Sequence, residues 1–273
     1  MSETLTDEAV QPHAVVLEEQ RGHVLLLTLN RPQARNAVDV RVHHALGSAL
    51  ERADADPGVR VVVLTGAGEA FCAGADLKAL ARGESLAPRD ARERAWGFAG
   101  FVAHHISTPT IVAVNGHALG GGTEIVLAAD LAVASSEASF GLPEVKRGIA
   151  AGAGGVFRLP EQVPRKLALE LILTGATITA DRALELGLVN RVVDPCRVLD
   201  EALALAEVVA ANAPLAVQAS KRMALGMRDG VPAGERDAWE LCMTELKVLM
   251  RSRDAAEGVS AFADRRTPRW EAR

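Results

Sequence analysis

Cysteine is scarce in this sequence. Its 273 residues include only Cys72, Cys196 and Cys242, an odd number set far apart. No pair has CxxC spacing, and none combines with histidine in a zinc-ligand pattern. We therefore expect reduced thiols in a cytoplasmic protein, with neither a disulfide framework nor a bound metal.

Long apolar runs and excess positive charge are also lacking. No stretch reaches the roughly 18 apolar residues that a membrane-spanning helix needs, because Asp130 ends the run 125–129. Residues 1–13 carry acids and no basic segment before an apolar one, so they are predicted to be a flexible leader and not a secretory signal. The net charge of -5 disfavours nucleic acid as a partner. We expect no membrane partner either.

What is present predicts an α/β fold. Hydrophobic residues make up 49% of the chain, enough for a sizeable core. Short β-branched runs at 15–19 and 24–29 predict a hairpin, and apolar residues at helical spacing follow from 39 to 53. Continuous apolar runs at 59–65 and 110–114 predict strands buried on both faces.

The pattern of strand, glycine-rich turn and helix then occurs twice, around 71–76 and 115–124. Beyond residue 197 the composition becomes helical, with breaks at 212–214 and 229–232. We predict three parts: a leader 1–13, a core 14–197 and a helical region 198–273.

The first turn, residues 71–78, is made of small residues after a buried strand. Such a turn lets the backbone approach a ligand, and a free N–H can donate to a ligand oxygen. A strand-to-helix turn capped by Asp76 explains the same residues. Taken alone, the structural interpretation is favoured here.

The second turn combines three glycines, 120–122, with an acid. N–H groups at a helix N-terminus suit an anion, although close packing of helix on sheet explains the glycines equally well. Glu124 lies about one turn into an apolar helix, where burial is costly unless the carboxylate has a task. No GxxxxGK[ST] is present, which argues against a nucleotide phosphate loop.

A second carboxylate, Glu144, follows the turn Phe140-Gly141-Leu142-Pro143. One such glutamate is most often a helix N-terminal acid. Two glutamates among small residues nevertheless fit general acid/base work on a substrate whose anion is held by the glycine turn. The adjacent pairs His43-His44 and His104-His105 do not have metal-ligand spacing, and no GxSxG supports a hydrolase.

The order of these motifs resembles the enoyl-CoA hydratase/isomerase, or crotonase, family from about residue 14 to the end. The resemblance rests on Asn30-Arg31-Pro32, on residues 71–77, on 113–116 with 120–124, on 140–144, and on Thr174-Gly175 with 187–189. It implies a crotonase-like spiral of ββα units, followed by a helical C-terminal region that mediates trimer formation. Two trimers commonly stack into a hexamer.

The resemblance also implies roles for individual residues. The N–H groups of Ala75 and Gly121 would bind the thioester oxygen, and Glu124 and Glu144 would be catalytic. Residues that would bind the substrate or its coenzyme A are Ala73, through its carbonyl, and Asp76, Leu77, Lys78, Phe262 and Arg265, with Arg266 beside them. No separate cofactor is expected, because coenzyme A is part of the substrate.

Retention of both glutamates favours an enoyl-CoA hydratase that converts a 2-enoyl-CoA to a 3-hydroxyacyl-CoA. Two alternatives remain open: a Δ3-Δ2 isomerase or racemase-like member, and an idle acyl-CoA-binding scaffold. Thr123 stands where many hydratases have cysteine. The sequence of these motifs is also similar to that of family branches that act on carnitine-derived or steroid-derived thioesters. The identity of the acyl group and the pathway therefore stay open.

Overall fold

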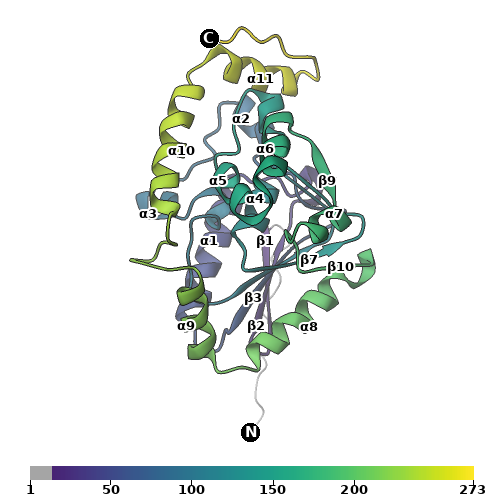
Figure 1. Ribbon diagram of the computed structural model, residues 1–273, viewed down its shortest axis with the longest axis vertical. Helices are drawn as coiled ribbons and strands as arrows, with labels where there is room; N and C mark the ends of the chain where they lie inside the picture. The colour runs from purple at the N-terminus through teal and green to yellow at the C-terminus, as the bar shows by residue number, and fades with distance from the viewer. Residues whose placement is uncertain (1–13) are drawn as a thin grey trace.

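The computed structural model describes residues 14–273, so the predicted leader 1–13 lies outside the described residues. Two sheets and a set of helices make up the fold (Figure 1). Six strands form the larger sheet: β1 Val16–Arg21, β2 Val24–Leu29, β3 Val61–Gly66, β5 Thr110–Val114, β7 Leu131–Ser135 and β10 Arg191–Val193. The smaller sheet contains β4 Ala70–Cys72, β6 His117–Leu119, β8 Ser139–Gly141 and β9 Thr177–Thr179.

From β3 to β8 successive strands alternate between the two sheets, which makes this part of the chain a spiral. The larger sheet has the order β1-β2-β3-β5-β7-β10, and the smaller has β4-β6-β8-β9. Each turn of the spiral adds one parallel strand to each sheet, β3 with β4, β5 with β6 and β7 with β8. The predicted crotonase-like repetition of ββα units is confirmed, as is the antiparallel β1–β2 hairpin.

Helices and short helical turns close each turn of the spiral. Asp39 caps α1, Val40–Ala55, by accepting from the N–H groups of Arg41 and Val42, as its position predicts. The other elements of this part are η1 Pro32–Ala34, α2 Leu77–Ala81, α3 Ala91–Ala95, η2 Phe98–Gly100, α4 Gly121–Ala128, η3 Pro143–Arg147, α5 Gly155–Gln162, α6 Arg165–Thr174 and α7 Ala180–Glu185.

The C-terminal part is helical, with breaks where the sequence predicts them. It contains η4 Pro195–Arg197, α8 Val198–Ala210, α9 Pro214–Ala224, α10 Glu235–Leu249 and α11 Arg253–Ala263. Helix α8 lies against the larger sheet (Figure 1) and buries Ala202 and Ala206 among Val63 and Ile111. The first helix beyond residue 197 thus completes the hydrophobic core of the preceding part. The division of the chain into two parts at residue 197 stays a prediction.

Helix α10 runs along one side of the molecule to α11, which lies at the end away from α9 (Figure 1). There α11 packs against α2 and η3. Within residues 14–273 no single helix is long and apolar enough to cross a membrane; only η4 and α8 together with α9, bent by 104°, pass by length and composition.

Candidate active site

The first glycine turn is anchored to the strand-like segment beside it. Val38 N donates to Gly74 O at 2.8 Å, and Asp76 N donates to Val38 O at 3.0 Å. Between them, the N–H of Ala75 donates no hydrogen bond to any described residue. Gly74 has φ +88°, a conformation that favours glycine. The turn therefore presents one unpaired amide at the end of β4.

Two buried ion pairs hold this turn in place. Asp76 caps α2 by accepting from Ala79 N at 3.1 Å, and its second oxygen accepts from Arg31 Nη2 at 2.9 Å. Arg31 also lies 3.5 Å from Asp39. Both carboxylate oxygens of Asp76 are thus bonded inside the protein, so the predicted cap is confirmed. A contact between Asp76 and coenzyme A stays a prediction.

The second glycine turn starts α4. Gly120, at φ +56°, donates its N–H to Gly141 O at 2.9 Å. The next amide, Gly121 N, opens the helix and donates to no described residue. A Cβ built on Gly74 would lie 3.1 Å from Gly121 N and 3.0 Å from Leu119 O. The two turns are therefore in contact, and each contributes one free amide.

Close packing around α4 explains the other glycines. A Cβ on Gly122 would lie 2.1 Å from Cys72 O, and one on Gly121 would lie 2.3 Å from the ring of Phe98. Both interpretations made from the sequence therefore hold: glycine allows helix-on-sheet contact and also leaves N–H groups exposed at the start of the helix.

Glu124 is buried with a relative exposure of 3%, as its apolar helix predicts. Its Oε1 accepts from Ala153 N at 2.7 Å and from Gly155 N at 2.9 Å. Both donors belong to the turn that begins α5. Two N–H bonds on one carboxyl oxygen favour its ionised form.

Glu144 lies in the first turn of η3, after Pro143. Its Oε2 is buried and has no hydrogen-bond partner among the described residues. A Cβ on Gly120 would lie 2.7 Å from its Oε1, so this carboxyl reaches the glycine turn at the start of α4. A buried, unpartnered carboxyl oxygen favours the protonated form.

The two carboxyl groups influence each other's protonation. Burial raises the pKa of Glu124, and the charge of nearby Glu144 raises it further. Burial likewise raises the pKa of Glu144. Two neighbouring buried acids hold a shared proton into the neutral range. The two N–H bonds favour an ionised Glu124, whereas burial of the unpartnered Oε2 favours a protonated Glu144.

The residues predicted to bind coenzyme A lie in the first glycine turn and in the C-terminal part of the chain. Ala73 and Lys78 are exposed, and Leu77 is half-buried. Helix α11, which contains Phe262, packs against α2 in the same chain, and Arg265 follows just after this helix. The ring of Phe262 lies 4.5 Å beneath the guanidinium of Arg147. Contacts of these residues with coenzyme A stay predictions.

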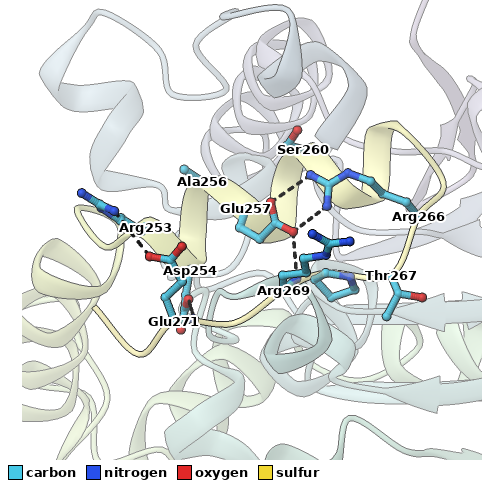
Figure 2. A pocket seen from close by; sticks show the side chains of 10 residues that line it. Arg253, Asp254, Ala256, Glu257, Ser260, Arg266, Thr267, Arg269 and Glu271 are labelled. Atoms are coloured by element: carbon cyan, nitrogen blue, oxygen red, sulfur yellow. Dashed lines mark hydrogen bonds and ion pairs between the residues drawn. The ribbon is translucent and has the colours of Figure 1, made fainter.

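A hollow of about 980 Å³ lies between α11 and the C-terminal segment (Figure 2). Its charged side chains pair with one another: Glu257 binds Arg266, and its Oε1 also accepts from Arg269 N at 2.8 Å. Neither Glu124 nor Glu144 lines it. The hollow is therefore separate from the paired carboxyl groups.

The contacts that three residues make in the site were not predicted from the sequence. Phe98, in η2, lies beside Gly121, and Arg31, which precedes Asp76 by 45 residues, binds its carboxylate. Thr123 joins three elements, because its Oγ1 lies 2.7 Å from Ala118 O and accepts from Gly141 N at 3.0 Å. No sequence pattern near Phe98 or Arg31 predicts these contacts, although Arg31 lies within a family motif.

Comparisons with known proteins find a matching family and similar structures. The family model for enoyl-CoA hydratase/isomerase matches residues 19–273. A carnitinyl-CoA dehydratase from Proteus mirabilis is 43% identical over 256 residues, which cover 93% of this chain and 97% of that protein. The crystal structure of a carnitinyl-CoA hydratase from Mycobacterium avium is 57% identical, with a TM-score of 0.92 over 95% of this chain and 99% of its own. That of an enoyl-CoA hydratase from Mycobacterium tuberculosis H37Rv is 46% identical, with a TM-score of 0.73 over 95% and 100%.

Proposed function

The chain belongs to the enoyl-CoA hydratase/isomerase family, and from that premise we propose that it adds water reversibly across the α,β double bond of a 2-enoyl-CoA. The product is a 3-hydroxyacyl-CoA, and the reverse reaction is a dehydration. One observation carries the proposal: two unpaired amides, Ala75 N and Gly121 N, lie on touching turns beside two buried carboxyl groups.

The free amides suit the charge that develops during this reaction. Attack of water on the β carbon moves negative charge to the thioester oxygen and gives an enolate-like transition state. Fixed N–H donors stabilise that charge without reorganising, and one donor contributes about 3 kcal/mol in comparable sites. Ala75 and Gly121 supply two donors of this kind.

The carboxyl groups divide the proton transfers between them. Glu124, whose Oε1 is held by two backbone N–H groups, keeps its charge and accepts a proton from the attacking water. Glu144, with an unpartnered buried Oε2, carries the proton that is delivered to the α carbon. In the dehydration direction the same groups act in reverse.

For the acyl group, we propose carnitinyl-CoA and its dehydrated partner as the first candidates. The support is the similarity to the relatives named for carnitinyl-CoA, at 43% and 57% identity. A homotrimer or a hexamer, and a cytoplasmic location, stay expectations from the family resemblance.

The test is loss or gain of the enoyl thioester absorbance on mixing the protein with carnitinyl-CoA, crotonyl-CoA, and longer or bulkier enoyl-CoAs. We expect turnover of at least one of these thioesters. Thioester binding with no turnover across the panel would contradict the proposal and favour the idle scaffold.

Glu124→Gln distinguishes hydration from isomerisation. Hydration needs both acids, so this variant should lose about 10² to 10⁴ in kcat. An isomerase that moves one proton at the α carbon would keep most of its rate. Measuring kcat for both variant and parent protein, with a 3-enoyl-CoA added to the panel, decides between them.

A further inference from the structure

We propose that Arg158 and Glu235 are positioning residues, which fasten helix α10 to the backbone turn that holds the Glu124 carboxylate. The inference rests on the proposed function only through the role of Glu124. It assigns to the helical C-terminal part a direct effect on the chemistry of the core.

The turn that holds Glu124 covers residues 151–155. Its two donors, Ala153 N and Gly155 N, lie 2.7 and 2.9 Å from Glu124 Oε1. Gly154 between them has φ +107°, so the chain reverses at this residue to aim both N–H groups at one oxygen. Any movement of α5 changes that aim.

Arg158 lies in the first turn of α5 and packs against this turn. A Cβ on Gly154 would lie 2.8 Å from its Nη1. That nitrogen is buried and has no hydrogen-bond partner among residues 14–273. The side chain of Arg158 is only 4% exposed. The guanidinium therefore supports the glycine turn through Nη1. Its other two nitrogens are free to bind a second element.

Glu235, the first residue of α10, binds the other two nitrogens of this guanidinium. Arg158 Nε donates to Glu235 Oε1 at 2.7 Å, and Nη2 donates to Oε2 at 2.6 Å. Trp239 Nε1 donates to the same Oε2 at 3.3 Å, and His105 Nε2 lies 3.5 Å away. Burial favours the neutral acid, but bonds from His105 and Arg158 hold the pKa of Glu235 at about 2. The bidentate pair thus stays charged at neutral pH.

Helix α10 contacts the same turn further along its length. Cys242 Sγ donates to Gly152 O at 3.5 Å. A Cβ on Gly152 would lie 2.2 Å from Leu246 Cδ1. Residues 235, 239, 242 and 246 lie on one face of the helix. The Arg158–Glu235 pair is the charged end of that contact, and it fixes the register of α10 on the turn.

The charges around Glu124 give the pair an electrostatic effect as well. Glu144 in η3 raises the pKa of Glu124, whereas the charge of Arg158 in α5 lowers it. One thiol also faces it, Cys242 in α10, and burial raises the pKa of this thiol, so it stays neutral. Arg158 is thus the cation that favours an ionised Glu124.

Arg158→Met is the first test. Loss of the cation, loss of support for the turn and exposure of Glu124 to an unbalanced Glu235 all raise the pKa of Glu124. We expect kcat at pH 7 to fall about 10-fold or more, because each unit of pKa shift costs a factor of ten in the ionised form. KM should change less than about 3-fold, and the pH profile of kcat should shift relative to that of the parent protein. Arg182→Met, which removes an exposed pair with Glu185, is the matched control and should change neither.

The double variant Arg158→Met with Glu235→Met distinguishes an effect on kcat from a loss of stability. Apolar replacement of a buried pair often restores stability. We expect the double variant to regain Tm but to keep the lowered kcat and the shifted pH profile. Recovery of kcat together with Tm would show that the pair only stabilises the fold, and would overturn the inference.

A second readout separates this inference from the proposed function. The infrared carbonyl stretch of protonated Glu124, identified by subtraction of the Glu124→Gln spectrum, reports its titration without any turnover. The band should persist to higher pH in Arg158→Met than in the parent protein. An unchanged titration sinks the positioning role, whereas absence of hydration in the parent protein sinks only the proposed reaction.

Discussion

The six-stranded sheet and the four-stranded sheet are neighbours in one chain, yet different interactions hold their strands. In the larger sheet, apolar side chains such as Val63 and Ile111 pack under α8 and are completely buried. In the smaller sheet the strands are three residues long, and polar atoms join them. Thr123, for example, binds both β6 and β8 from the first turn of α4.

This difference shows where each sheet can tolerate change. Apolar packing is spread over many side chains, so one loss lowers stability without moving a particular atom. The smaller sheet instead places single N–H groups and carboxyl groups, and its glycines leave no spare room. We therefore expect changes at the amides and carboxyl groups beside the smaller sheet to affect kcat, and changes in the apolar core of the larger sheet to affect stability.

The largest effect should come from Glu144→Gln. Removing the proton donor should lower kcat by about 10³ to 10⁴, since general acid catalysis contributes on this scale. The Tm should not fall, because the variant replaces a carboxyl whose buried Oε2 has no partner. Steady-state kinetics and thermal unfolding on the same preparation check both parts.

Its control is Val63→Ala in the larger sheet. This change should lower the free energy of unfolding by about 2 kcal/mol and leave kcat per folded molecule unchanged. A large loss of kcat in Val63→Ala would contradict the division of labour between the sheets.

Gly74→Ala should have the next largest effect. Gly74 and Gly22 both have positive φ, +88° and +57°, so alanine costs about 1 to 2 kcal/mol of backbone strain at either position. Only at Gly74 would the new Cβ also press on Gly121 N and Leu119 O; at Gly22 it would meet nothing within 4 Å. Displacing one donor should lower kcat about 100-fold in Gly74→Ala. Equal kcat values in the two variants would show that the touching turns do not form the anion site.

A smaller effect concerns stability against pH. Folded Glu124 and Glu144 have raised pKa values, so between the unfolded value near about 4.3 and neutral pH the folded state binds more protons. The free energy of unfolding should therefore fall as the pH rises through this window, by at least about 1 kcal/mol. Glu124→Gln with Glu144→Gln should flatten the slope in urea titrations at several pH values.

At lower pH the sign is reversed. The pKa of folded Glu235 is about 2, so its contribution is present above the unfolded value and is lost as the pH falls toward 2. Glu235→Gln should remove this acid dependence and leave the slope near neutral pH. A slope near neutral pH that follows Glu235 instead would contradict the assignment.

The two sheets also differ in how well the sequence predicts them. Strands β2, β3 and β5 have five or six residues and continuous apolar runs, so their positions follow from the sequence. Strands β4, β6 and β9 have three residues each, too few for a hydrophobic period, so the sequence predicts turns at β4 and β6 and no element at β9. Their existence follows only from the spiral as a whole.

The site shows the same limit. Burial of Glu124 follows from its apolar neighbours, and the cap at Asp76 follows from its place before a helix. That Arg31 binds Asp76 across 45 residues, or that Phe98 covers Gly121, depends on tertiary contacts without local pattern. The roles of the two carboxyl groups came from family resemblance, and their unequal hydrogen bonding is a property of the folded chain.

The smallest effect compares one threonine from each sheet. Thr123→Cys removes a hydroxyl that bonds two strands of the smaller sheet, whereas Thr65→Cys removes a single bond from Thr65 Oγ1 to Ala113 O at 2.9 Å. Both side chains are buried, so the number of bonds is the main difference. At about 1 kcal/mol for each bond, Thr123→Cys should cost about 2 kcal/mol of stability and Thr65→Cys about 1 kcal/mol. Because the thiol still fills the space beside Gly141, kcat should change less than about 3-fold in either variant. Equal stability losses, measured by urea unfolding, would show that the polar junction of the smaller sheet holds its strands no more tightly than a single hydroxyl holds the larger one.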